Sequence, residues 1–592
     1  MNDLANRLAG QAASRSVTLP LSVISTATLM VGLYLLYWTS AIWFRYHPHL
    51  PWRDLLVVLR DIIEFNAMGL TQDNFEKLLA PHYFSHRIAI PRLLLWMDIN
   101  IAGGKSHVFY AAAALSMLTI FICYVRAACQ YFDDISTRIF AASLALVLLC
   151  SPSHSWNLLN AINSSWHITI AFSVLSITVL PTATGGFSTA RWMASGSFAI
   201  LAAFATFGGV VTVLLLPMLA LLFDRRAVVP VLVVASAFTW WYTRGVFSDA
   251  DIAAVWKVGS PDVVAALRET ANGAIDRQTI VNVVRKSLLL LSWPWSQTSQ
   301  FWPLVTATGS VLLLCCAWLY SLRQYLVKPD RMSPWLLLCL SGATVCLGIV
   351  VTVQLGRLIE QPNHMHGPSY ERYQTIVVCY WIFLAGLALS ATTKLSGGFR
   401  PLGMLGIAAL VWFLIDAQGG YLMEEITSAE AAATLYRQGE AAHQAGASPP
   451  AGNQFSPQYI FSFDALFKSR NLTYRSNHGD LSGRGAPGSC RQSQANIGIT
   501  ESGDGTLAMK VSLPWRLAMV TRDILVLRDG EFATRLQPSH LGNYSPLALA
   551  SAGENAWTGR MSNTVSPENN LFLLMETPIG LWGLCRLGRQ PH

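Results

Sequence analysis

The chain has 592 residues, of which 53% are hydrophobic and only 12% are charged. Soluble globular proteins contain about 25% charged residues, so this composition excludes that class and indicates a polytopic membrane protein. The net charge is +8, but the lysines and arginines form short clusters between apolar runs instead of one basic face, which argues against nucleic acid as a partner.

Eleven apolar runs are predicted to be membrane spans, because a span needs about 20 apolar residues. The run 192–223 could form one long helix, but Gly208 and Gly209 favour a break near Thr206, so we expect two spans there. The predicted spans are 20–43, 107–128, 137–152, 167–183, 192–207, 208–223, 228–245, 302–322, 334–355, 373–391 and 401–417.

The basic residues predict the orientation. Arg7 and Arg15 precede a first run that is too long for a signal peptide, so 1–19 is predicted to be a cytoplasmic tail. With two spans in 192–223, every inner loop carries lysine or arginine, as the positive-inside rule expects. The C-terminus then lies outside, and the predicted outer segments are 44–106, 153–166, 246–301 and 356–372.

After the last span the composition changes. We expect a linker at 418–456 and a β-rich, sandwich-like soluble domain at 457–592, where short strand-like runs alternate with turns. The pair Asp529-Gly530 between two apolar runs predicts a hairpin. Cys490 and Cys585 form a candidate disulfide in an oxidising compartment, whereas the other eight cysteines lie in or beside apolar spans.

The first outer segment, within the predicted catalytic module 20–417, gathers charged and titratable groups. Asp54 follows the first span closely, in Pro51-Trp52-Arg53-Asp54, where a partly buried carboxylate could accept a proton from a hydroxyl. Asp61 and Glu64 are lesser alternatives, because a solvated face of an interfacial helix explains them equally well. Asp54 is therefore the predicted general base.

Basic groups at two outer segments could bind phosphate. His86, Arg87 and Arg92 lead into an apolar helix, where they either contact a phosphate or only reach the lipid headgroups. Arg372 and Tyr373 stand at the start of a late span, where they either hold a lipid-linked phosphate or act as ordinary interfacial anchors. Both alternatives stay open for each set.

Aromatic, amide and imidazole side chains in the outer segments suit contacts to a sugar or an acceptor, and equally suit an interfacial loop. The candidates are Trp52, His154, Trp156, Asn157, Asn160, His167, His364, His366 and Glu371. The histidines show no spacing as diagnostic as HExxH, so no metal site is predicted.

Three segments together resemble a known family. His86-Arg87-Ile88…Pro91-Arg92-Leu93-Leu94 resembles an "EHRI-x-x-PRLL" signature, Trp156-Asn157-Leu158-Leu159 resembles a "W-E-N-L-L-W" loop, and Gly367…Glu371-Arg372-Tyr373 resembles a "G…SRY" segment. These segments resemble bacterial membrane proteins with the architecture of GT-C glycosyltransferases, and the resemblance covers 20–417. Ser85, Glu371 and the missing glutamate between Trp156 and Asn157 depart from the pattern.

The resemblance implies an inverting glycosyltransferase of the bacterial inner membrane, active on the periplasmic face. It implies a polyprenyl-phosphate sugar as donor, with arabinofuranose, a hexose or an aminosugar as the sugar. The acceptor would be a glycan or a surface protein such as a pilin, and the first-loop carboxylate that acts as base best matches Asp54. No cofactor is expected, and we expect a monomer surrounded by membrane lipid.

Other functions fit the same composition. A membrane ligase of the O-antigen ligase type would share the outward site and the arginines. A transporter or flippase of lipid-linked sugars would show charges inside its spans and repeated or broken helices, which this sequence largely lacks. A non-catalytic surface-binding protein would leave the predicted spans unexplained.

Overall fold

The fold comes from a computed structural model. It describes residues 20–37, 87–102, 106–151, 160–180, 188–224, 226–244, 277–292, 301–327, 333–360, 373–395, 399–416, the seven strands of the C-terminal region, and single positions or pairs near 39–43, 58, 78–80 and 157. The chain divides into a helical unit and a second unit that contains the strands, and each is described by itself.

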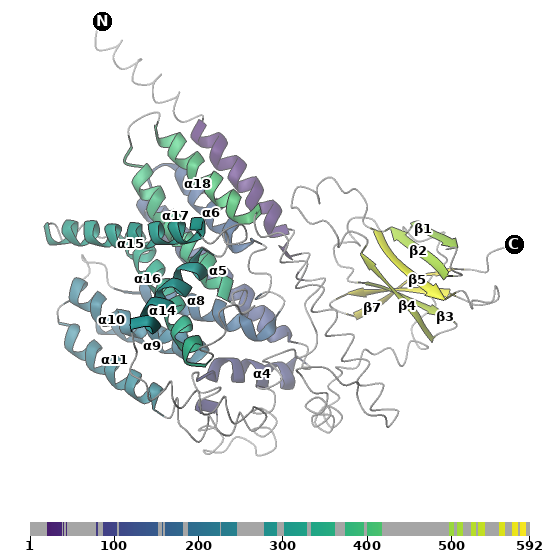
Figure 1. The fold of residues 1–592 in the computed structure, drawn as a ribbon, viewed down its shortest axis with the longest axis horizontal. Coiled ribbons are helices and arrows are strands. Elements are labelled where there is room, and N and C mark those ends of the chain that lie inside the picture. Colours follow the sequence, from purple (N-terminus) through teal and green to yellow (C-terminus); the bar gives the residue numbers. More distant parts are fainter. Residues whose placement is uncertain are drawn as a thin grey trace, which may run out of the picture. The chain divides into compact units, whose positions relative to one another are not determined.

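Every predicted span coincides with a described helix (Figure 1). The helices are Pro20–Tyr37, α5 (His107–Tyr131), α6 (Ile135–Leu149), α8 (Ser164–Thr178), α9 (Thr189–Ala205), α10 (Val210–Phe223), α11 (Val228–Thr243), α15 (Phe301–Val327), α16 (Pro334–Glu360), α17 (Gln374–Thr392) and α18 (Phe399–Asp416). Two more helices, α4 (Ala89–Ile101) and α14 (Arg277–Leu291), lie inside segments predicted to be outer loops.

Five of the described helices are long and apolar enough to cross a membrane: Pro20–Tyr37, His107–Tyr131, Leu304–Gln324, Pro334–Leu355 and Gln374–Thr392. Several others, such as α6 and α11, are apolar but shorter than 18 residues. The helical unit therefore has the character of a membrane protein, and the count of eleven spans stays a prediction.

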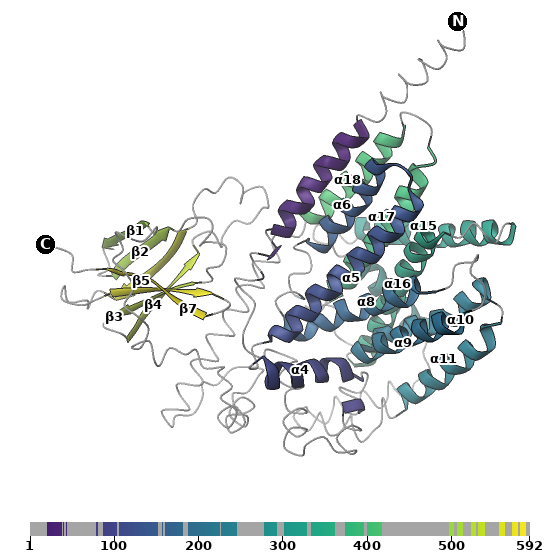
Figure 2. The same cartoon turned by 180° about the vertical axis from the view of Figure 1, so that it is seen from behind.

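Helix α8 is deeply enclosed in the helical unit, with 12 of its 15 residues buried. It contacts α5, α9, α16 and α17, and Figure 2 shows it lying between α5 and α16. Its hydroxyl side chains pair with those of neighbouring helices, through Thr169–Thr206 at 2.9 Å and Ser173–Thr212 at 2.7 Å. Buried hydroxyls in an apolar bundle need such partners, because no water reaches them.

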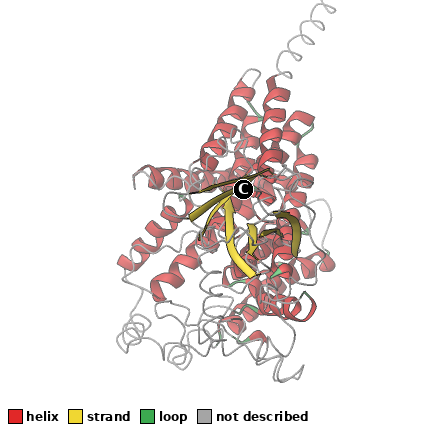
Figure 3. Cartoon of the chain, turned by 90° about the vertical axis from the view of Figure 1, so that its right-hand side faces the viewer, coloured by secondary structure: helices red, strands yellow, loops and turns green. Residues whose placement is uncertain are grey.

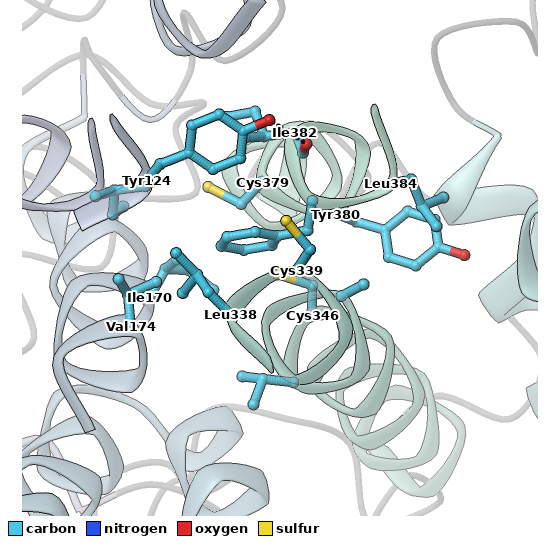
Figure 4. Close-up of a cluster of buried hydrophobic side chains, with 14 of the residues drawn as sticks. Tyr124, Ile170, Val174, Leu338, Cys339, Cys346, Cys379, Tyr380, Ile382 and Leu384 are labelled. Atoms are coloured by element: carbon cyan, nitrogen blue, oxygen red, sulfur yellow. Dashed lines mark hydrogen bonds between the residues drawn. The ribbon is translucent and has the colours of Figure 1, made fainter. Parts of the chain in front are cut away.

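Small residues let α16 and α17 approach closely. A Cβ added at Gly342 would lie 2.7 Å from the Phe383 ring, and one added at Gly386 would lie 2.6 Å from Cys339 Sγ. Figure 4 shows the buried cluster around this contact, with the thiols of Cys339, Cys346 and Cys379 among apolar side chains. Glycine at helix contacts is a common packing device in membranes.

The predicted break between the fifth and sixth spans is confirmed. Helix α9 ends at Ala205, a 3-10 turn η3 covers Phe207–Gly209, and α10 begins at Val210. Thr206 is extended, and a Cβ added at Gly209 would lie 2.1 Å from the backbone carbonyl of Ala202. The turn can fold back onto α9 only because position 209 has no side chain.

The predicted outer segment 153–166 and the fourth span at 167–183 stay predictions. Helix α8 begins at Ser164, three residues before the predicted span, and the 3-10 turn η2 (Ala161–Asn163) precedes it. Serine and asparagine suit the first turn of a helix, although an apolar count excludes them from a span. Ser164 and Ser165 of this segment therefore belong to the first turn of α8.

The second unit contains antiparallel strands, drawn in yellow in Figure 3. Their order is β1-β2-β5-β4-β3-β6-β7, for β1 (Asn496–Glu501), β2 (Thr506–Ser512), β3 (Asp523–Arg528), β4 (Glu531–Pro538), β5 (Ala556–Ser562), β6 (Leu571–Thr577) and β7 (Gly580–Leu587). Strands β3 and β4 flank positions 529 and 530 and pair antiparallel, with Arg528 opposite Glu531, as the hairpin signal predicts. Strand β4 joins β5 through two residue pairs, and sandwich packing stays a prediction.

The close approach at Gly209 makes a specific prediction. We expect Gly209→Ala to lower the free energy of unfolding by about 2–3 kcal/mol, because the added methyl group overlaps the backbone of α9. Gly196→Ala in the interior of α9 is the matched control, since a Cβ there meets nothing within 4 Å. The control should leave stability unchanged or raise it by up to about 1 kcal/mol. Equal thermal midpoints for both purified variants in detergent would contradict this packing.

Candidate functional site

The structure describes part of the predicted site. Arg87, Arg92, Asn157, Asn160, His167 and Tyr373 are described. The remaining predicted residues, Trp52, Asp54, Asp61, Glu64, His86, His154, Trp156, His364, His366, Glu371, Arg372 and Cys490, lie outside the described residues. Cys585 lies in β7, opposite Leu573 of β6.

Hydrogen bonds join the second outer segment to α8 and α17. Asn157 Nδ2 donates to Thr375 Oγ1 at 2.7 Å, and Thr375 Oγ1 lies 3.3 Å from His167 Nε2. All three side chains are at least 99% buried. Two of the predicted sugar-contact residues, Asn157 and His167, therefore meet at a threonine two positions after Tyr373.

Two aromatic residues close in sequence to His167 and Thr375 also contact each other. The rings of Trp166 and Tyr373 pack edge to face, with centroids 5.3 Å apart. Both side chains are buried, and such pairs add about 0.5–1.5 kcal/mol beyond the area they bury. The contact fixes the start of α17 against the first turn of α8.

Four buried polar atoms at the start of α8 have no hydrogen-bond partner among the described residues. They are Asn157 Oδ1, Asn160 Oδ1, Asn163 Nδ2 and Ser164 Oγ. We call Asn157, Asn160, Asn163 and Ser164 the asparagine cluster; each is between 1% and 5% exposed. A buried polar atom without a partner costs about 1–3 kcal/mol.

Four such costs together would rival the total stability of a typical protein, which is about 5–15 kcal/mol. Any hydrogen-bond partner of these atoms must therefore come from outside the described residues, either from another part of the chain, from water or from a ligand. The cluster contains amides and a hydroxyl and no formal charge. Within the described residues, no three His, Cys, Asp or Glu side chains lie close enough together to hold a metal ion.

Arg87 has protein partners in the structure. Its Nε donates to Tyr242 O at 2.8 Å, Nη1 donates to Leu79 O at 2.7 Å, and Nη2 donates to Arg244 O. Its guanidinium also lies 4.7 Å from the centre of the Trp241 ring. Burial lowers the pKa of Arg87, but arginine stays charged in proteins.

The carbonyls of Tyr242 and Arg244 lie at the C-terminal end of α11, where helix carbonyls lack partners within the helix. Arg87 satisfies two of them and places its charge at the negative end of the helix dipole. Its backbone N–H donates to Tyr242 Oη, which donates in turn to Ala203 O of α9. Arg87 thus fastens the first outer segment to the ends of α9 and α11.

Arg92 makes a similar contact one turn along α4. Its Nη1 donates to Leu78 O at 3.0 Å and to Ala80 O at 2.6 Å, and its side chain is buried. Both arginines of the predicted phosphate set therefore bond to backbone carbonyls of the segment that precedes α4. Phosphate binding by Arg87 and Arg92 stays a prediction, and their hydrogen bonds to these carbonyls support a positioning role.

Asp98 of α4 is fully buried and fastens α4 to α5. Its carboxylate accepts from the backbone N–H of Ser106 at 2.7 Å and of Val108 at 2.9 Å. Ser106 precedes α5 with a φ of 61° and makes no side-chain cap of its own, so Asp98 supplies that cap from another helix. Burial raises the pKa of Asp98, and the backbone donors only partly offset this effect.

Comparisons of the chain with protein-family models, with characterised proteins and with solved structures found no match. The GT-C resemblance therefore stays a prediction, and the functional argument depends on the geometry of the described residues.

Three residues at this site were missed by the sequence reading: Asn163, Ser164 and Thr375. The amide side chains at 157, 160 and 163 stand out in an apolar chain, and this is a signal that could have found Asn163. Thr375 carried no signal, because its role depends on a contact with a residue 218 positions away.

The contacts of Arg87 predict a loss of stability without its guanidinium. We expect Arg87→Lys to lower the free energy of unfolding by about 2–3 kcal/mol, because an ammonium group cannot reach three carbonyls in one plane. Arg126→Lys on the exposed side of α5 is the matched control and should change stability by less than about 0.5 kcal/mol. Thermal unfolding in detergent measures both. Unchanged stability of the Arg87→Lys variant would contradict the positioning role of Arg87.

The raised pKa of Asp98 predicts a pH dependence. A group whose pKa is higher in the folded state contributes stability below its unfolded pKa of about 3.9, and this contribution is lost as pH rises through the folded pKa. Asp98→Asn cannot titrate. The free energy of unfolding of the native protein should therefore fall relative to that of Asp98→Asn as pH rises above about 4. A constant difference up to about pH 7 would show that burial does not raise this pKa.

Proposed function

We propose that the protein is a membrane glycosyltransferase of the GT-C type that moves a sugar from a polyprenyl-phosphate donor to a hydroxyl acceptor. In this proposal eleven spans place the N-terminus in the cytoplasm of a bacterium, and the outer segments and the β-rich C-terminal region in the periplasm. The donor is a substrate, and no cofactor takes part.

One observation carries the proposal. The hydrogen bonds from Asn157 through Thr375 to His167 bring the second outer segment and the start of α17 into one polar site. Arg372 is the residue directly before Tyr373, so a cation that could bind a phosphate stands three positions before Thr375 in the chain. Amides, hydroxyls and aromatic rings beside such a cation suit a sugar phosphate.

The proposed reaction inverts the anomeric centre. Asp54 accepts the proton of the acceptor hydroxyl while the acceptor oxygen forms a bond to the anomeric carbon. The bond from that carbon to the phosphate oxygen breaks, and the polyprenyl phosphate leaves with the electron pair. Arg372, Tyr373 and His86 stabilise the developing charge on the phosphate, which is the electrostatic contribution that usually dominates catalysis.

Arg87 and Arg92 have a supporting part in this proposal. Arg87 bonds to backbone carbonyls at the end of α11, and Arg92 bonds to Ala80 O within the first outer segment, the predicted segment that also contains His86 and Asp54. Placing reacting groups within a fraction of an ångström is worth several kcal/mol of the barrier, on the order of 7–11 kcal/mol at best. The acceptor, a glycan or a surface protein, would approach from the aqueous side.

Transfer from a defined donor tests the proposal. We expect membranes containing the protein to transfer radiolabel from a polyprenyl-phosphate sugar to an endogenous acceptor, and Asp54→Asn to lower the rate by about 10²- to 10⁴-fold. Asn100→Ala on the exposed side of α4 is the control and should keep native activity. If Asp61→Asn or Glu64→Gln lowered the transfer rate and Asp54→Asn did not, the general base would be Asp61 or Glu64 and not Asp54. Transfer of a whole glycan from a diphosphate-linked donor, without sugar transfer, would indicate a ligase.

A further inference from the structure

We propose that the outward face of α11 binds one anionic phospholipid of the surrounding bilayer, with the lipid phosphate on Arg244 and an acyl chain along the helix. The site consists of Val229, Val233, Ala237, Trp240 and Arg244, all of them exposed, which we call the α11 stripe. The proposal concerns a lipid of the bilayer and does not depend on the proposed reaction.

Helix α11 lies at the edge of the helical unit, and Figures 1 and 2 both show it on the outside of this unit next to α10. Of its 16 residues, Ala235 and Tyr242 are buried, and Tyr242 donates to Ala203 O of α9. Val233 and Trp240 each stand two positions before one of these buried residues, which is about 200° around a helix. The α11 stripe therefore faces away from the rest of the helical unit.

The apolar part of the stripe has the length of one lipid chain. Val229, Val233 and Trp240 are 68%, 61% and 65% exposed. The step from Val229 to Trp240 covers 11 positions, or about 16 Å of helix. One leaflet of a bilayer supplies about 15 Å of hydrocarbon, half of a core of about 30 Å. An acyl chain of a single leaflet can therefore lie along the whole stripe.

A cation ends the stripe. The guanidinium of Arg244 lies 5.4 Å from the centre of the Trp240 ring, and within the described residues the structure shows it in no hydrogen bond or ion pair. Arg87 at the same helix end differs, because its guanidinium donates to three backbone carbonyls, one of which is Arg244 O. Among the described residues, the side-chain donors of Arg244 therefore remain available for a phosphate.

The charges at this helix end favour an anionic headgroup. A guanidinium donates two parallel hydrogen bonds to a phosphate, and tryptophan is enriched at the depth of the headgroups. Arg87 adds a second positive charge beside Arg244, and α11 itself contains no acidic residue. Phosphatidylglycerol carries a net negative charge, whereas the choline group of phosphatidylcholine neutralises its phosphate. The stripe should therefore prefer phosphatidylglycerol.

Fluorescence quenching by brominated lipids tests the proposal, because bromine quenches a tryptophan that it contacts. The full-length protein is reconstituted in vesicles of phosphatidylcholine and phosphatidylglycerol, with one of the two lipids brominated on its acyl chains. The signal of Trp240 is the difference between the native protein and Trp240→Phe. We expect phosphatidylglycerol to bind beside Trp240 about fivefold more strongly than phosphatidylcholine, which is the effect of one arginine near an anionic membrane surface.

Matched variants separate the site from the bulk lipid. Arg244→Gln should lower the binding ratio to about one, and it keeps the backbone carbonyl that accepts from Arg87, which protects the fold. Arg126→Gln on the exposed side of α5 is the control and should keep a ratio of about five. Leu118→Trp, at a position of α5 that is 52% exposed, reports the bulk lipid and should give a ratio of about one.

Three results would overturn the proposal. Equal binding of the two lipids beside Trp240, or a preference that Arg244→Gln leaves unchanged, would show that Arg244 holds no lipid phosphate. Absence of quenching by either lipid would place Trp240 against protein and not against lipid. Displacement of the brominated lipids by added undecaprenyl phosphate, without any preference for phosphatidylglycerol, would mean that the stripe holds a polyprenyl lipid instead of a phospholipid.

Discussion

The structure depends on one constraint: polar groups inside an apolar helical bundle must find partners within the protein, because the surroundings supply none. Helix α8 shows how this constraint is met. Along its length, Thr169 and Ser173 pair with hydroxyls of the next helices. At its first turn the pairing is incomplete, since Asn163 Nδ2 and Ser164 Oγ have no partner among the described residues.

Charged side chains meet the same constraint in another way, by serving as helix caps. Arg87 binds carbonyls at the end of α11, and Asp98 accepts from two N–H groups at the start of α5. Each contact joins two separate elements and places the charge at the favourable end of a helix dipole. Arg87, which the sequence suggests for phosphate binding, thus bonds to protein groups in the structure.

The helices could be predicted to a large extent because a long apolar run beside lipid has few alternatives to a helix. The break at Thr206 followed from the two glycines after it, and the structure shows the physical reason at Gly209. Helix α14 was missed because Arg285 and Lys286 lower its hydropathy below that of a span.

The site could be predicted only in part. Composition indicated Asn157, Asn160 and His167, since amides and imidazoles stand out in an apolar chain. Thr375 could not be found in this way, because a threonine near a helix start is ordinary and its partner is remote in sequence. The partners of Arg87 were equally hidden, since backbone carbonyls have no sequence signature.

In the proposed function, a lipid-linked sugar binds where α8 and α17 begin. Photo-crosslinking measures this most directly, with a polyprenyl-phosphate analogue that carries a diazirine on its sugar ring and with mass spectrometry of the labelled peptides. The account predicts labelling of peptides that contain Asn157 to His167 or Tyr373 to Thr375, reduced by excess unlabelled donor. Labelling confined to other helices or to the strands, with none at these two segments, would contradict it.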